Sequence, residues 1–79
     1  MARYTLLLTP EPDEAGYSVR VPILPGLYTQ GDTYTEAVAN ARAAIAFHLD
    51  CLREEGEPIP EEPARLRPEG EGRRVRIEV

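Results

Sequence analysis

The chain has 79 residues, of which 42% are hydrophobic and 29% are charged, a balance typical of one small globular domain. Nine basic and fourteen acidic residues give a net charge of −5, which argues against a free nucleic-acid-binding protein, because such proteins carry a basic face. One cysteine and one histidine cannot form an internal disulfide or a zinc site. Since no apolar run is long enough for a membrane span or a signal peptide, we expect a cytoplasmic protein.

The beginning of the chain predicts two strands joined by an exposed loop. Residues 3–9 and 17–21 both alternate between two faces, which is the pattern of a strand. Residues 10–16 contain two prolines and three carboxylates, so they are expected to form a solvated loop. Pro22 ends the second strand because proline cannot donate a hydrogen bond to the ladder.

A tight turn and a third strand follow. Pro25 and Gly26 occupy the two central positions of a predicted type II turn, since proline fixes φ and glycine supplies the positive φ. Residues 27–30 then predict a short third strand. Its inward face stays open, because both alternating pairs of side chains are plausible in the core.

A long helix has the clearest local signals in the chain. Thr33 and Glu36 fit a capping box, in which each side chain bonds a backbone N–H group of the other residue. Neither Pro nor Gly occurs from Tyr34 to Glu55, and apolar residues recur with helical spacing across this span. Gly56 suits the position just after the helix end.

The last part of the chain predicts a connection and a fourth strand. Residues 57–72 contain four prolines and five glutamates and are expected to be extended and solvated. Residues 73–79 alternate again, and their arginines would discourage unwanted pairing of an edge strand.

Together these elements predict one α+β domain over residues 1–79. Residues 1–56 would form a β-β-β-α core, and the fold would be an antiparallel three-stranded meander with one long helix on one face and a C-terminal edge strand. A core this small supplies only about 3–5 kcal/mol. Self-association as a homodimer or homotetramer is therefore expected.

Residues that could carry chemistry are few. His48 and Cys51 are three residues apart on the helix, but no nearby acid orients them and nothing resembles an oxyanion device, so packing or interface roles are favoured. The first three predicted strands contain no Asp or Glu, which disfavours a metal site for phosphodiester cleavage. We expect no catalytic residues, no metal site and no cofactor.

One aromatic side chain lies off the apolar stripe of the helix. Phe47 is flanked by small residues, among them Ala43 and Cys51, which would let another element approach closely. Together with the apolar face of the last strand, this predicts an oligomer interface formed by Phe47, Ala43, Cys51, Val75 and Ile77.

Five short motifs occur in a characteristic order over residues 4–60. They are an acidic loop before an aromatic residue (13–17), V-x-V-P-x-L-P-G (19–26), T-Q-G-D-T (29–33), E-A-x-A-N-A-x-x-A-I (36–45) and G-E-P-I-P (56–60). In this order and spacing the chain resembles the HicB-like antitoxins of bacterial and archaeal toxin–antitoxin pairs.

The resemblance implies a truncated relative of the ribonuclease H fold without that fold's catalytic carboxylates. It also implies that the protein binds and silences a small HicA-type toxin that cleaves RNA. Many relatives carry a C-terminal DNA-binding segment, whereas only 23 residues follow Gly56 here. Sequence-specific DNA binding is therefore not expected from this chain alone, and no membrane partner is expected.

The sequence thus predicts an antitoxin-like binding protein that is not an enzyme and that occludes a HicA-like toxin. The candidate partner-binding residues are Glu11, Asp13 and Glu14 in the first loop, because an acidic patch complements an RNA-gripping basic surface. The alternative hypothesis is a stand-alone small ligand-binding or regulatory domain that has no toxin partner.

Overall fold

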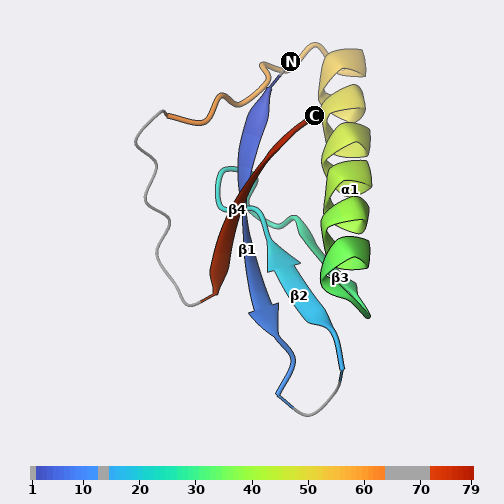
Figure 1. Cartoon of the computed structure of the whole chain (residues 1–79). Helices are drawn as coiled ribbons and strands as arrows, with labels where there is room; N and C mark the ends of the chain where they lie inside the picture. Colours follow the sequence, from blue (N-terminus) through green and yellow to red (C-terminus); the bar gives the residue numbers. More distant parts are fainter. Residues whose placement is uncertain (1, 13–14, 64–71) are drawn as a thin grey trace.

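The protein folds as one four-stranded antiparallel sheet with a single helix across one face (Figure 1). A computed structural model describes residues 2–12, 15–63 and 72–79. The strand order is β3-β2-β1-β4, with α1 between β3 and β4 in the chain. The elements are β1 (Arg3–Pro10), β2 (Tyr17–Arg20), β3 (Tyr28–Gly31), α1 (Tyr34–Glu54) and β4 (Arg73–Glu78). The predicted β-β-β-α-β fold is confirmed, and β4 is an edge strand beside β1.

The turn before β3 has the predicted form. Gly26 has a φ of +87°, and the N–H of Leu27 donates to the carbonyl of Leu24 at 3.1 Å. Because that N–H closes the turn, β3 begins at Tyr28, one residue later than the sequence predicts.

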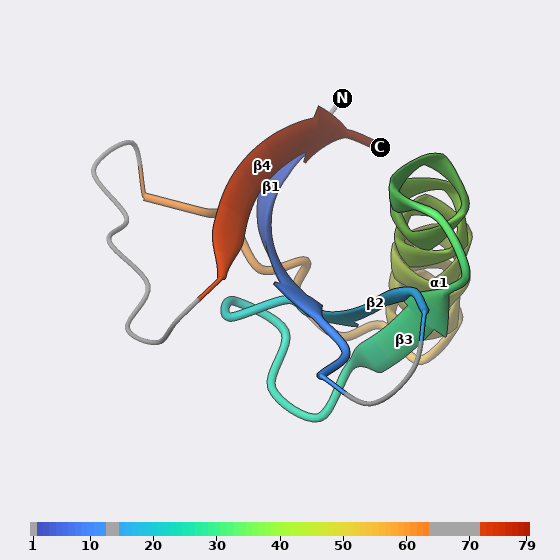
Figure 2. The same ribbon diagram turned by 60° about the horizontal axis from the view of Figure 1, so that its bottom comes forward.

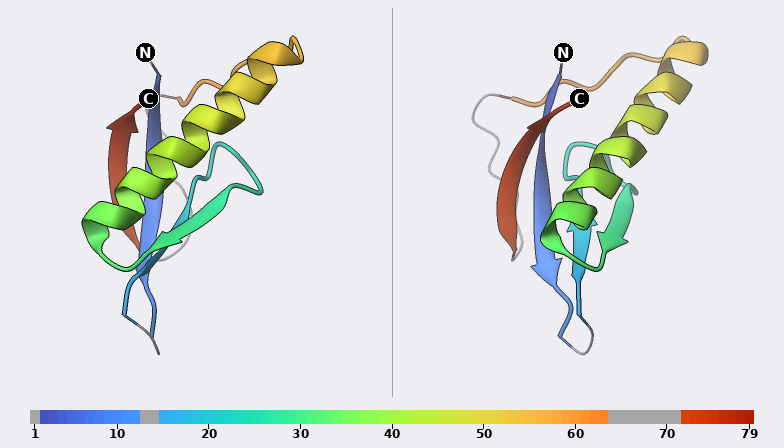
Figure 3. Two further views of the ribbon diagram at one scale, coloured as in Figure 1. Left: turned by 90° about the vertical axis from the view of Figure 1, so that its right-hand side faces the viewer. Right: turned by 45° about the vertical axis from the view of Figure 1, so that its right-hand side comes forward.

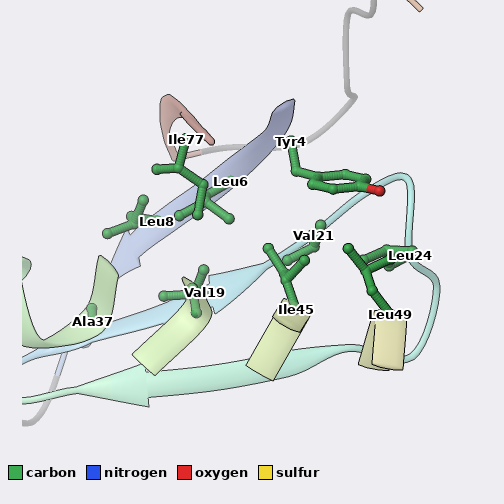
Figure 4. Close-up of a cluster of buried hydrophobic side chains, with 11 residues drawn as sticks. Tyr4, Leu6, Leu8, Val19, Val21, Leu24, Ala37, Ile45, Leu49 and Ile77 are labelled. Atoms are coloured by element: carbon green, nitrogen blue, oxygen red, sulfur yellow. The ribbon is translucent and has the colours of Figure 1, made fainter. Parts of the chain in front are cut away.

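The core lies between the sheet and α1. Tyr4, Leu6 and Leu8 of β1 point toward the helix, where they face Ile45 and Leu49 (Figure 4). All five side chains are buried, as the two periodicities predict. The opposite face of β1 is also buried over part of its length, which the sequence did not indicate.

The start of α1 is fixed by its cap. The hydroxyl of Thr33 accepts a hydrogen bond from the N–H of Glu36 at 3.1 Å. The carboxylate of Glu36 accepts a hydrogen bond from the N–H of Asp32 at 3.3 Å. The predicted capping box would have used the N–H of Thr33, so the donor is one residue earlier in the chain than expected.

The end of α1 is also fixed by backbone hydrogen bonds. Gly56 has a φ of +72° and donates to Arg53 at 3.2 Å, while Glu57 donates to Leu52 at 2.9 Å. These two hydrogen bonds form a Schellman motif, which explains why the helix stops where the glycine occurs.

Side chains of α1 meet both edges of the sheet, which curls toward the helix (Figure 2). Val79 exchanges two backbone hydrogen bonds with Ala2, the residue before β1. Because the backbone groups of successive residues point to opposite sides of an antiparallel strand, the carbonyl of Glu78 points away from β1. Arg42 donates to that carbonyl at 2.6 Å. By the same alternation the carbonyl of Gln30 points away from β2, and Asn40 donates to it at 2.8 Å. Each edge strand therefore has one outward carbonyl paired with the helix.

The segment that follows α1 is less solvated than the sequence predicts. The β1–β2 register would place Pro22 opposite Thr5, but proline has no N–H and the chain turns away there. The carboxylate of Glu62 takes this place, accepting from the N–H of Thr5 at 2.5 Å and from its hydroxyl at 2.8 Å. It also pairs with Arg76 of β4 at 3.3 Å, and its side chain is only 3% exposed. Part of the predicted connection is thus a packed element, whereas residues 64–71 lie outside the described ones.

Candidate partner-binding surface

The described parts of the chain offer no constellation for metal-dependent chemistry. Within residues 2–12, 15–63 and 72–79, no group of three or more His, Cys, Asp and Glu side chains could hold a metal ion. His48 and Cys51 are both half-buried on α1. No helix among the described residues combines the length and the apolar character needed to cross a membrane.

The first loop is described only at its two ends. Glu11 donates its N–H to the carbonyl of Gly16 at 3.1 Å, which closes the loop, and Gly16 has a φ of +118°. Asp13 and Glu14, the other two predicted partner-binding residues, lie outside the described residues. Glu11 and Asp32 line one small hollow. The β2–β3 register brings Asp32 to this end of the sheet, and sequence reasoning missed it because the two carboxylates are 21 residues apart.

The outward face of α1 carries the most exposed aromatic side chain of the described residues. Phe47 is 72% exposed, Ala43 is exposed and Cys51 is half-buried, so these three predicted interface residues lie together on one side of the helix. Figure 3 shows α1 lying across one face of the sheet, and the exposure of Phe47 and Ala43 places them on the side of the helix that faces away from it.

The other two predicted interface residues lie elsewhere. Ile77 is 6% exposed and belongs to the core, and Val75 packs against the same cluster. Both alternate onto the inner face of β4, so the apolar stripe of that strand is used within the monomer.

The outer face of the sheet has a different charge from the chain as a whole. The registers place Leu7 between Arg20 and Arg74, and Arg76 lies on the same face of β4. A hollow of about 330 Å³ opens beside Leu7 and Tyr28 on this face. The three arginines of this face contrast with the net charge of −5, and most of the described exposed acidic residues lie on α1 and in the loops, with Glu78 of β4 as an exception.

One buried phenol is electrostatically perturbed. Burial raises the pKa of Tyr4, Arg53 opposes the rise, and the carboxylates of Glu61 and Glu62 add to it. The hydroxyl of Tyr4 donates to the carbonyl of Pro60 at 2.9 Å. This hydrogen bond holds the segment after α1 against β1, and it indicates a structural role for the phenol.

These features can be compared with known proteins. The model of the family described as "HicB_like antitoxin of bacterial toxin-antitoxin system" matches residues 4–69. The chain belongs to this family.

Relatives of different lengths share the HicB-like sequence. A UPF0150 protein of Synechocystis sp. is 40% identical over 65 residues, which are 82% of this chain and 81% of that protein. Antitoxin HicB of Escherichia coli is 41% identical over 58 residues, which are 73% of this chain but only 41% of that protein. This HicB-like chain therefore corresponds to most of the shorter relative and to about two fifths of the longer one.

A solved structure has the same fold. The crystal structure of the N-terminal domain of Burkholderia pseudomallei antitoxin HicB superposes with a TM-score of 0.82 and 26% sequence identity. The match covers 98% of this chain and 96% of that domain. The HicB-like fold thus extends over the whole sheet and helix.

Proposed function

We propose that this HicB-like protein is an antitoxin that binds a small HicA-type toxin and blocks the toxin's access to messenger RNA. The match of the antitoxin family model to residues 4–69 is the observation that carries the proposal. Such a toxin cleaves RNA in the cytoplasm, so its antitoxin would act there too. The protein would work by binding and would not itself be an enzyme.

Charge complementarity is the physical basis of the proposed binding. A protein that grips RNA presents a basic surface to the phosphates. A chain with a net charge of −5 can be steered toward that surface, and rim charges act mainly on the rate of association. Glu11, Asp13 and Glu14 are proposed as rim residues of this contact.

Co-expression tests the proposal directly. We expect the protein to rescue cells from an adjacent HicA-like gene product and to co-purify with it. A purified toxin should lose RNA cleavage when the HicB-like protein is added in equal amount. Failure to bind or neutralise any adjacent small protein would contradict the proposal and would favour the alternative, a stand-alone regulatory domain.

A further inference from the structure

A row of exposed residues runs along the outward face of α1. Glu36, Ala43, Phe47, Asp50 and Glu54 are separated by three, four or seven positions, so they lie on the same side of the helix. All five are exposed, and Phe47 is near the middle of the row. With a rise of 1.5 Å per residue, the row from first to last carboxylate is about 27 Å long.

This helix face is acidic because the row contains three carboxylates and neither arginine of α1 belongs to it. Arg42 lies on the flank toward β4 and donates to the carbonyl of Glu78. Arg53 pairs with Asp50 at 3.1 Å, which neutralises one carboxylate of the row. The carboxylates at the two ends of the row, Glu36 and Glu54, flank the exposed aromatic side chain, and Glu36 also accepts the hydrogen bond from the N–H of Asp32.

The charges argue against a second copy on this face. An antiparallel two-fold pairing centred between Ala43 and Phe47 would place Glu36 of one copy opposite Glu54 of the other. Like charges so placed repel each other. A basic partner would instead meet opposite charges at both ends of the row and could receive Phe47 between them.

We propose that the outward face of α1 is the surface that grips the toxin, with Phe47 inserted into an apolar socket bordered by basic groups. This inference rests on the proposed antitoxin function. Ala43 and the half-buried Cys51 leave room for close approach around the ring. Buried aromatic anchors surrounded by weaker contacts carry most of the free energy at protein interfaces. Glu11, the described residue of the rim proposed above, lines one hollow with Asp32, and Asp32 donates its N–H to Glu36, so Glu11 adjoins this end of the row.

Substitution of the aromatic anchor tests the inference. We expect Phe47→Ser to weaken toxin binding at least about 30-fold, mainly through faster dissociation. Tyr28→Ser is the matched control, since Tyr28 is 69% exposed but lies on the sheet. It should change the dissociation constant less than twofold. Both constants would be measured by surface plasmon resonance with purified toxin, after urea unfolding has established that each variant folds.

A charge substitution provides a second, independent measurement. Glu54→Lys should slow association with the toxin several-fold at low salt, and the difference should shrink as salt rises. If both Phe47→Ser and Glu54→Lys bind like the wild type, the inference is overturned while the antitoxin function stands. If Phe47→Ser instead abolishes self-association of the HicB-like protein alone, the face is a self-interface and the inference is also overturned. If the wild type binds no toxin, the proposed function fails and the inference fails with it.

Discussion

Glu62 replaces a missing strand residue in the sheet. β2 ends before Pro22, and there the carboxylate of Glu62 supplies the acceptor that the N–H of Thr5 would otherwise lack. The same carboxylate links β1 to Arg76 of β4. Local patterns could not predict this contact, because 57 residues separate the donor from the acceptor. The signal available in the sequence was Pro22, which ends β2 and so leaves the backbone groups of Thr5 on the neighbouring strand without a strand partner.

Removing this carboxylate should destabilise the fold. We expect Glu62→Ala to lower the free energy of unfolding by about 2 kcal/mol, because it leaves the N–H of Thr5 and the guanidinium of Arg76 without their acceptor. Urea unfolding followed by circular dichroism would measure the difference. The exposed neighbour provides the control, since Glu61→Ala should cost less than about 0.5 kcal/mol. Equal effects of the two substitutions would contradict the assigned role.

The phenol of Tyr4 should make the fold sensitive to alkaline pH. Its pKa is raised in the folded state, so the unfolded chain releases this proton at lower pH than the folded protein does. The contribution of Tyr4 to stability is therefore full below about pH 10 and is lost as pH rises through the folded-state pKa.

Tyr4→Phe should remove this part of the alkaline loss. At pH 7 the variant should be about 1 kcal/mol less stable, because its hydrogen bond to Pro60 is gone. Between pH 10 and 11 its urea midpoint should fall less than that of the wild type. Tyr28→Phe, at an exposed position, should follow the wild type at both pH values. An unchanged slope in Tyr4→Phe would contradict the argument.

At the scale of the elements, local chemistry predicts most of the fold. The strand at β1, the turn at Pro25 and Gly26 and the cap of α1 all depend on neighbouring residues, and the structure confirms each of them, although both faces of β1 are buried. Local patterns could not predict the role of the inner face of β4. Whether Val75 and Ile77 face the core or a partner depends on the pairing register with β1, which is distant in the sequence.

The cap of α1 offers a test at this scale. Thr33→Ala should lower the free energy of unfolding by about 1 kcal/mol, since the N–H of Glu36 loses its acceptor. Thr35→Ala, at an exposed position inside the first turn, should be neutral or slightly stabilising because alanine has the higher helix propensity. Thermal unfolding of both variants would show the contrast. A cap variant as stable as the control would argue against the assigned cap.

At the scale of the whole molecule, charge is unevenly distributed. The outer sheet face carries three arginines, whereas most of the described exposed carboxylates, Glu78 excepted, lie on α1 and in the loops. Composition predicts the net charge of −5 but not this separation, which arises from the strand register. Self-association also stays a prediction at this scale. Val75 and Ile77, two of the residues expected at its interface, pack in the core of one chain instead.

Reversing the loop charges should affect toxin association more than dissociation. We expect the triple variant Glu11→Lys, Asp13→Lys and Glu14→Lys to reduce the association rate about tenfold at low salt, because rim charges steer encounter. At high salt the triple variant and the wild type should converge, since the screening length shortens. Stopped-flow mixing with labelled toxin at several salt concentrations would measure both rates. Association that is indifferent to salt and to these three residues would discard the steering mechanism.

The pairing of the two chain ends has a practical consequence. Ala2 and Val79 exchange two backbone hydrogen bonds, of 3.2 and 2.8 Å, and both ends lie far from the first loop (Figure 1). A few added residues could therefore join the ends, and new ends could be opened at the exposed Pro25–Gly26 turn without cutting a strand. Such a circular permutant, or a fluorescent protein fused at either end, would leave the first loop unobstructed.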